Sequence, residues 1–188
     1  MKNRKDHIHQ TAQNLFRQNG YSATSMRDLA EGVGIEAASL YSHIKSKEEI
    51  LQVICFKMAN EFFEGVEKAE TEGLKAEETL RLAIKEHLKV IAANRDAAAV
   101  FFHDWRHLSE PFLSDFKQMR RRYESWFRHV INEGMENGVF KKGDTKFVVL
   151  TIFSAMNWTY DWYNPKKKLN APDLANDLCS ILLNGLKK

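Results

Sequence analysis

The sequence contains little cysteine and little proline, and each scarcity excludes a class of protein. Two cysteines in 188 residues, Cys55 and Cys179, cannot build a disulfide-stabilised secreted domain, so we expect both to be buried thiols. Three prolines and nine glycines are too few for a fibrous or low-complexity chain. The length is sufficient to bury a hydrophobic core, in one domain or in a domain with a small appendage.

Long hydrophobic runs are also missing. The longest runs, such as residues 97–102, are far shorter than the about 20 apolar residues that a membrane-spanning helix needs. The N-terminal segment is basic but lacks the apolar core of a signal peptide. We therefore expect a cytoplasmic protein with no membrane partner.

Motifs for catalysis and cofactor binding are absent as well. The chain has no glycine-rich phosphate loop, no G-x-S-x-G nucleophile turn and no cysteine–histidine pair in a suitable local context. His103 and His107 have a spacing that can hold zinc on a helix, but no third ligand is near and the glutamate of the metalloprotease motif is missing. We therefore predict a protein that is not an enzyme, with no catalytic residue, no metal site and no cofactor; a helical enzyme is the disfavoured alternative.

Helical periodicity runs through almost the whole chain. Ile8, Ala12, Leu15 and Phe16 follow the spacing of an amphipathic first helix, which Gly20 ends. The same spacing predicts helices over about 48–69, 80–91, 97–108, 111–136 and 145–163, and a last helix after Asn170. No segment alternates as a strand would. The predicted fold class is all-α, with about nine helices.

The segment Thr24–Leu51 has the pattern of a helix-turn-helix, in which a second short helix enters the major groove of DNA. Leu29 and Ala30 lie at helical spacing, and Gly34 can end that helix in a left-handed conformation at no steric cost. Leu40 then gives the second helix its buried contact. Such spacing makes two helices meet at a steep angle through a tight turn.

The distribution of charge agrees with a DNA-binding segment at the N-terminus. Residues 1–47 contain seven Lys and Arg against four Asp and Glu, whereas the rest of the chain contains equal numbers of each sign. Affinity for DNA depends strongly on neutralising phosphates, so a basic excess confined to this segment supports the motif.

The same segment resembles the DNA-binding domain of the tetracycline-repressor (TetR) family of bacterial regulators. The matching positions are Ile8, Ala12, Leu15, Phe16, Gly20, Tyr21, Thr24, Ser25, Met26, Arg27, Asp28, Leu29, Ala30, Val33, Gly34, Ile35, Ala38, Ser39, Leu40, Tyr41, His43, Ile44, Ser46, Lys47 and Glu48. Glu36 departs from the small or polar residue that is usual there. The resemblance implies a helix-turn-helix domain over 1–47 and a helical ligand-sensing and dimerisation domain over 48–188.

We predict that Glu36–Ile44 is the recognition helix. Short side chains at its N-terminal end allow close approach to the groove, while Tyr41 and His43 can reach flanking phosphates and Lys47 adds a charge beside them. Tyr41 can also pack its ring in the head. The predicted contacts to a palindromic operator duplex, which the resemblance places at the same positions, are Ser25, Arg27, Ala37, Ala38, Ser39, Tyr41, His43 and Lys47.

Aromatic residues gather between 101 and 163, where most fill a core and some can line a cavity for an apolar ligand with one polar end. The predicted ligand-binding residues are Phe101, His103, Trp105, Arg106, His107, Tyr123, Phe127, Asn157 and Trp158. Arg120, Arg121 and Arg122 either hold a coenzyme A head group with Arg106 or form a solvated face. We expect His87, next to Glu86, to lie on a helix surface.

The stretches 100–108 and 157–165 are similar to the sensor domains of TetR regulators of fatty-acid, steroid and aromatic-acid degradation, some of which respond to acyl-coenzyme A thioesters. This resemblance implies a repressor that a small apolar or acyl-coenzyme A effector releases from DNA. A drug-sensing efflux repressor of the same fold is the alternative. A purely architectural DNA-binding protein would not need so large a neutral body.

The segment 145–163 is apolar almost all round, so one copy of the chain cannot easily bury every face of it. Pairing this helix and the last helix with their two-fold mates would form a four-helix bundle. We therefore predict a homodimer whose two heads meet successive major grooves of the operator.

Overall fold

A computed structural model describes residues 4–164 and 170–186, and these residues form two compact units. Unit 1 combines residues 1–58 with 96–117, and unit 2 combines residues 59–95 with 118–188. Helices make up the regular structure of the described ranges, which confirms the predicted all-α class. Within those ranges, none of the helices has both the length and the apolar character needed to span a membrane.

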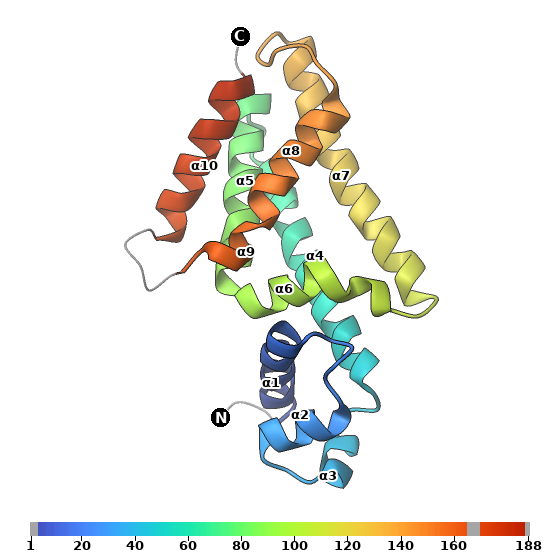
Figure 1. The fold of residues 1–188 in the computed structure, drawn as a ribbon. Helices are drawn as coiled ribbons and strands as arrows, with labels where there is room; N and C mark the ends of the chain where they lie inside the picture. The colour runs from blue at the N-terminus through green and yellow to red at the C-terminus, as the bar shows by residue number, and fades with distance from the viewer. Residues whose placement is uncertain (1–3, 165–169, 187–188) are drawn as a thin grey trace. The chain divides into compact units, whose positions relative to one another are not determined.

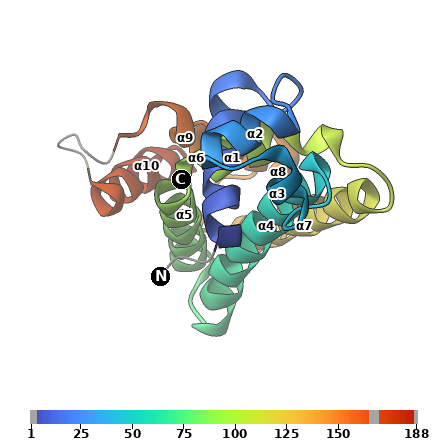
Figure 2. The same cartoon turned by 90° about the horizontal axis from the view of Figure 1, so that it is seen from below.

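Unit 1 begins with three helices, α1 (Arg4–Asn19), α2 (Met26–Val33) and α3 (Ala37–Tyr41), drawn in blue in Figure 1 and seen from the side of α3 in Figure 2. It also contains the start of α4 (Lys47–Thr71), α6 (Arg95–His103) from residue 96 onward, the 3₁₀ helix η1 (Asp104–His107) and the start of α7 (Phe112–Glu136). As the sequence predicts, Ile8, Ala12 and Phe16 of α1 are buried and α2 packs on both α1 and α3.

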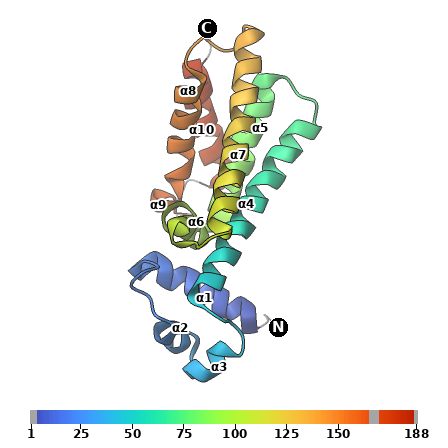
Figure 3. The same ribbon diagram turned by 90° about the vertical axis from the view of Figure 1, so that its right-hand side faces the viewer.

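Unit 2 contains the remainder of α4 and α7 together with α5 (Ala76–Ala93), α8 (Thr145–Asn157), α9 (Thr159–Trp162) and α10 (Ala171–Leu186). Helix α5 packs against α8, α9 and α10, and α8 and α10 lie side by side (Figure 3). Its core joins residues far apart in sequence; the largest fully buried side chains there include Leu80, Ile84, Phe127, Ile131, Phe140 and Leu183.

The predicted helix over 145–163 is interrupted. Helix α8 ends at Asn157, Trp158 caps it, and α9 starts afresh at Thr159. Thr159 is buried and donates its hydroxyl to the carbonyl of Met156 at 2.6 Å, so a side chain competes with the helical backbone at this point. The continuous apolar pattern gave no sign of this break. Counting α8 and α9 together, and α6 with η1, the described elements match the nine predicted segments.

The prediction of two buried thiols is confirmed, and side chains cap the starts of two helices. Cys55 and Cys179 are buried free thiols. Ser46 caps the start of α4 by accepting a hydrogen bond from the backbone N–H of Glu49 at 3.1 Å. Asn170 does the same for α10, accepting from the backbone N–H of Asp173 at 2.9 Å. The proposed division of the chain at residue 47 stays a prediction.

Candidate DNA interface and effector site

Local hydrogen bonds define the helix-turn-helix. The Ser25 hydroxyl accepts from the backbone N–H of Asp28 at 3.1 Å, and the Asp28 carboxylate accepts from the backbone N–H of Ser25 at 2.7 Å. The Asp28 carboxylate accepts from both the backbone N–H and the hydroxyl of Ser25, and these two bonds hold its pKa below its usual value. At the other end, Gly34 has φ 73° and ends α2 in the left-handed conformation, as predicted. Leu40 is fully buried against this turn region.

The outer side of α3 presents most of the predicted groove contacts. Ala37, Ala38 and Ser39 are exposed, and they are the first three residues of the helix. The regular helix is shorter than predicted because it ends at Tyr41, and the following residues to Ile44 form a turn. Tyr41 is 55% exposed, so its ring faces solvent rather than packing in the head.

The four remaining predicted DNA contacts differ in exposure and in the hydrogen bonds that they already make. Arg27 and His43 have exposed side chains. Ser25 is exposed as well, but its hydroxyl already serves the cap of α2 by donating to the Asp28 carboxylate at 2.8 Å. Lys47 is half-buried, and its ammonium donates to backbone carbonyls of the α1–α2 turn, at 2.6 Å to Tyr21 and 2.8 Å to Thr24.

Four of the predicted ligand residues, Phe101, Trp105, Arg106 and His107, belong to unit 1. The His107 ring stacks on Tyr21 with a centroid distance of 5.1 Å, and its Nε2 is 3.3 Å from the Ser22 hydroxyl. Arg106 lies over the Trp105 ring at 4.6 Å. Phe101 and Trp105 both contact Phe116; the ring centroids are 5.3 and 5.8 Å apart.

In unit 2, a buried polar triad joins three helices. His87 of α5 lies with Nδ1 3.0 Å from the Tyr123 hydroxyl on α7 and with Nε2 3.0 Å from Oδ1 of Asn157 on α8. Because the amide oxygen of Asn157 can only accept, Nε2 carries the proton and Nδ1 accepts from Tyr123. The triad is therefore satisfied with a neutral imidazole.

Aromatic rings enclose this triad. Phe62 of α4 stacks on His87 at 4.3 Å, and Phe153 and Phe127 lie 5.8 and 5.3 Å from Tyr123. Burial among these rings lowers the pKa of His87 to about 3 and raises the pKa of Tyr123. Of the predicted ligand residues, Tyr123, Phe127 and Asn157 are thus brought together in one aromatic environment.

His87 was wrongly predicted to lie on a helix surface; it is 3% exposed. The carboxylate of its neighbour Glu86, whose side chain is 15% exposed, pairs with Lys68 at 2.6 Å. The sequence held a signal for the buried position, since residue 87 is three after Ile84 and four before Ile91, within the apolar stripe of α5. A histidine in that stripe needs partners, and these come from α7 and α8.

Further residues of the predicted ligand site are exposed. Trp158 is 64% exposed at the break between α8 and α9. The Arg122 guanidinium lies 5.5 Å from the centre of the Phe63 ring, and Arg121 is exposed. His103, also predicted as a ligand residue, is exposed at the end of α6.

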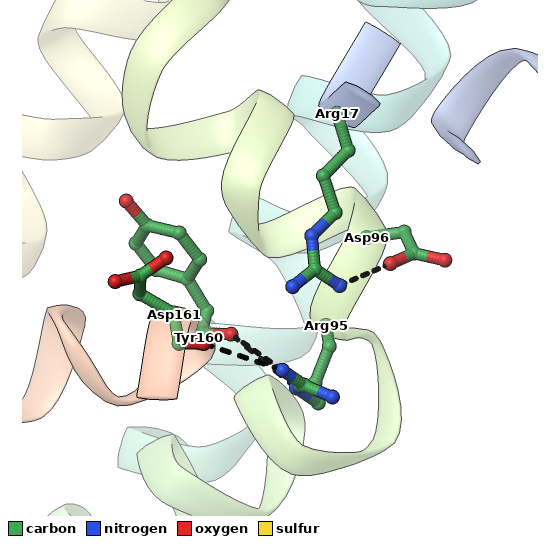
Figure 4. Close-up of polar contacts among 5 residues, drawn as sticks. All are labelled: Arg17, Arg95, Asp96, Tyr160 and Asp161. Atoms are coloured by element: carbon green, nitrogen blue, oxygen red, sulfur yellow. Dashed lines mark hydrogen bonds and ion pairs between the residues drawn. The ribbon is translucent and has the colours of Figure 1, made fainter. Parts of the chain in front are cut away.

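Arg95 and Asp96, the first two residues of α6, form polar contacts with different segments of the chain (Figure 4). Within unit 1, Arg17 of α1 donates to the Asp96 carboxylate at 2.5 Å. Within unit 2, Arg95 donates to the backbone carbonyls of Tyr160 at 3.2 Å and Asp161 at 3.4 Å. The two residues that bond to α1 and to α9, Asp96 and Arg95, are therefore neighbours in the sequence.

Two family models match the chain. The model described as bacterial regulatory proteins, tetR family, matches residues 8–54, and the model described as tetracyclin repressor-like, C-terminal domain, matches residues 73–186. The chain is also 25% identical over 185 residues to the HTH-type transcriptional repressor KstR2 of Rhodococcus jostii (strain RHA1), covering 97% of this chain and 91% of that protein.

Solved structures share the fold over nearly the whole chain. The ketosteroid transcriptional regulator KstR2 of Mycobacterium tuberculosis has a TM-score of 0.93 at 24% identity, covering 100% of this chain and 97% of that one. AibR, solved in complex with isovaleryl coenzyme A and operator DNA, has a TM-score of 0.82 at 21% identity, covering 96% and 98%. At these identities the likeness shows the fold.

Proposed function

The chain belongs to the TetR family of bacterial transcriptional regulators, and we propose that it is a repressor released from operator DNA by a small apolar or acyl-coenzyme A effector. The observation that carries the proposal is the pairing of an exposed α3 face in unit 1 with a buried aromatic and polar cluster in unit 2. We expect the protein to act by binding alone, in the cytoplasm where its DNA lies.

For DNA, we propose that α3 enters the major groove. The exposed Ala37, Ala38 and Ser39 allow a close approach, and Tyr41 and His43 are free to meet phosphates. Arg27 and Ser25 at the start of α2 would contact the backbone of the other strand. The apolar side chains at positions 37 and 38 favour contacts with thymine methyl groups.

We propose that two copies of the chain pair through α8 and α10. Phe147 and Leu150 on α8 are 70% and 44% exposed, and Ile181 on α10 is 71% exposed. Such large apolar side chains on adjacent helices are typical of a subunit interface. Sedimentation velocity should show a dimer for the wild type and a monomer for Phe147→Glu combined with Ile181→Glu. Leu74→Glu, at a residue 39% exposed, is the matched control and should stay dimeric; a monomeric wild type at micromolar concentration would refute the pairing.

We propose that the effector binds in unit 2 beside Tyr123, Phe127 and Asn157, with its apolar part among the aromatic rings and its carbonyl near the triad. The names of the relatives support this class of effector, because KstR2 is a ketosteroid regulator and AibR was solved with an acyl-coenzyme A. The alternative, a drug-type sensor, would use the aromatic rings without a thioester.

A thermal-shift screen tests the effector class. Acyl-coenzyme A esters should raise the unfolding midpoint, whereas coenzyme A alone and cationic drugs should not. Tyr123→Phe should reduce the shift, and Tyr41→Phe, the same chemical change on the exposed head, should leave it as in the wild type. Stabilisation by drugs and by no thioester would replace the acyl-coenzyme A assignment with the drug-sensing one.

We propose that α4 transmits the signal, because this helix carries Phe62 against the triad in unit 2 and Lys47 against the turn in unit 1. Release requires only that the effector bind the state with widely spaced heads more tightly than the DNA-competent state. A difference of about 3 kcal/mol would shift the equilibrium more than a hundredfold.

A further inference from the structure

His87 of α5 is a hydrogen-bond donor of fixed direction in the core of unit 2. The side chain is 3% exposed, and its ring nitrogens lie 3.0 Å from the Tyr123 hydroxyl and 3.0 Å from the amide oxygen of Asn157. Nε2 carries the ring proton and donates it to Asn157, because an amide oxygen can only accept. A group that takes the place of Asn157 must therefore present an acceptor oxygen.

The Tyr123 side of the triad is fixed by packing. Its ring contacts Phe63, Phe127 and Phe153, with centroid distances of 5.5, 5.3 and 5.8 Å. The hydroxyl of Tyr123 donates to Nδ1 of His87, so the tautomer with its proton on Nε2 is kept whichever group meets Nε2. The direction of the donor thus does not depend on the amide that it binds.

The Asn157 side of the triad lies at the end of a helix. Asn157 is the last residue of α8 and is only partly buried, and the next residue, Trp158, is 64% exposed. The bonds that close this end run from the Trp158 backbone N–H and from the Thr159 hydroxyl to the carbonyl of Met156. Neither bond uses the Asn157 side chain, so its amide can turn into water while the backbone of α8 stays helical.

The exchange of Asn157 for a ligand selects the chemistry of that ligand. A neutral carbonyl oxygen replaces one acceptor at Nε2 by another, so the buried N–H of His87 is never left unpaired. An alkyl chain or an ammonium group offers no acceptor and would leave that N–H without a partner. A carboxylate would bring a charge among aromatic rings, where Phe62 stacks on the imidazole at 4.3 Å. A ketone or thioester carbonyl therefore fits best.

We propose that His87 determines the specificity of the effector site by donating its Nε2–H to a neutral carbonyl of the effector, which displaces the amide of Asn157. This inference rests on the proposed function, and it adds the atom that recognises the ligand and the side chain that makes way. The displacement breaks a side-chain bond between α5 and α8, two helices that share the core of unit 2. Effector binding is thereby coupled to the contact between these helices.

The test compares two ligands that differ at one carbon. Octanoyl-coenzyme A is a thioester, and S-octyl-coenzyme A is the thioether with a methylene group in place of the carbonyl. Isothermal titration calorimetry measures both dissociation constants for the full chain and for its His87→Phe and Asn157→Leu variants. The matched controls are His129→Phe and Asn60→Leu, at exposed positions of α7 and α4. Heptyl methyl ketone provides a carbonyl on the same alkyl chain without coenzyme A.

The wild type should bind the thioester about tenfold more tightly than the thioether, as a single neutral hydrogen bond allows. His87→Phe keeps a ring against Phe62 but has no donor, so it should bind both compounds with nearly equal affinity. Asn157→Leu removes the competing acceptor and should strengthen binding of the thioester severalfold. Both controls should bind as the wild type does. Ketone binding that depends on His87 would identify the carbonyl alone as sufficient, whereas thioester binding without ketone binding would identify the thioester as its source.

Three results would overturn the proposal and leave the proposed effector class intact. The first is equal wild-type affinity for thioester and thioether, and the second is a preference that His87→Phe retains. The third is a loss of preference in Asn157→Leu equal to that in His87→Phe, since the amide would then recognise the carbonyl. No binding of either coenzyme A compound or of the ketone would contradict the effector class itself, and this proposal with it.

NMR of the wild type provides a second route if His87→Phe does not fold. The ring nitrogens of His87 are observed in protein labelled with the heavy nitrogen isotope. Nε2 should stay protonated when the thioester is added, and its signal should shift differently with the thioester and with the thioether. An Nε2 signal that bound thioester leaves unchanged, or that both compounds shift equally, would overturn the proposal.

Discussion

In each unit, a nitrogen-bearing side chain forms hydrogen bonds to more than one segment. The side chain in unit 1 is charged, and the side chain in unit 2 is neutral. In unit 1 the charged Lys47 binds carbonyls of a turn at 2.6 and 2.8 Å, in a half-buried position. In unit 2 the neutral, buried His87 joins Tyr123 and Asn157 at 3.0 Å among aromatic rings. A cation can be kept where carbonyl dipoles and solvent remain, whereas the aromatic core accepts only a neutral group.

This difference has a consequence for regulation. The polar triad of unit 2 lies among aromatic rings, where a ligand carbonyl would interact more strongly than it would in water. Since α4 contributes Lys47 to the first site and Phe62 to the second, the two regions are linked through one helix.

Removal of the His87 side chain, which joins the polar triad of unit 2, should give the largest loss of stability. His87→Ala leaves the Tyr123 hydroxyl and the Asn157 amide buried without their partner and opens a cavity beside Phe62. We expect the free energy of unfolding to fall by about 3–5 kcal/mol, measured by urea denaturation at fixed protein concentration. His129→Ala, at an exposed position of α7, is the control; equal losses for the two variants would mean that the triad does not stabilise unit 2.

The neutral state of His87 predicts a dependence of stability on pH. Its pKa is about 3 in the folded protein and 6.5 in the unfolded chain, so between these values the unfolded state binds the additional proton. Its contribution is complete above pH 6.5 and is lost as pH falls towards 3, by about 1.4 kcal/mol per pH unit. The difference in slope between wild type and His87→Gln measures it; parallel curves from pH 6.5 to 4.5 would show that the imidazole is protonated in the folded state.

A smaller loss follows from deleting one hydroxyl. Tyr123→Phe keeps the ring among Phe127 and Phe153 but leaves Nδ1 of His87 buried without its donor. We expect a cost of about 1–3 kcal/mol by urea denaturation. Tyr41→Phe, at an exposed ring, should cost nothing measurable, and a Tyr123→Phe protein as stable as the wild type would contradict the hydrogen bond.

A single substitution in the helix-turn-helix should change the free energy of unfolding least, because short-range hydrogen bonds stabilise it. Ser25→Ala removes the side-chain acceptor for the backbone N–H of Asp28, and we expect a loss of about 1 kcal/mol without DNA. Ser114→Ala, on an exposed serine near the start of α7, is the control for the loss of a hydroxyl. An effect of Ser25→Ala as large as that of His87→Ala would remove the contrast between the units.

The same contrast explains what the sequence could predict. The cap at Ser25, the left-handed Gly34 and the buried Leu40 follow from residues a few positions apart, so the helix-turn-helix was predicted correctly. The triad joins His87 to Asn157 across 70 residues, and no local pattern reports such a pairing. Only the position of His87 within an apolar stripe signalled that it is buried.

Two further differences have the same origin. The segment over 145–163 kept its apolar character through Trp158, so the break after α8 depends on the buried Thr159 rather than on a glycine or proline. The spacing of His107 from His103 gave no sign that its ring stacks on Tyr21, which lies 86 positions earlier in the chain. Contacts of this kind depend on how segments distant in sequence pack.

Release of DNA by an effector tests the account most directly. A fluorescent palindromic duplex, selected by the wild type from a random library, is titrated with the protein and then with isovaleryl coenzyme A and longer acyl-coenzyme A esters. We predict high anisotropy with protein alone and a return to the free value with at least one thioester, but with neither coenzyme A nor free acids. Failure to select any duplex, or a complex that no thioester dissociates while a cationic drug does, would contradict the account.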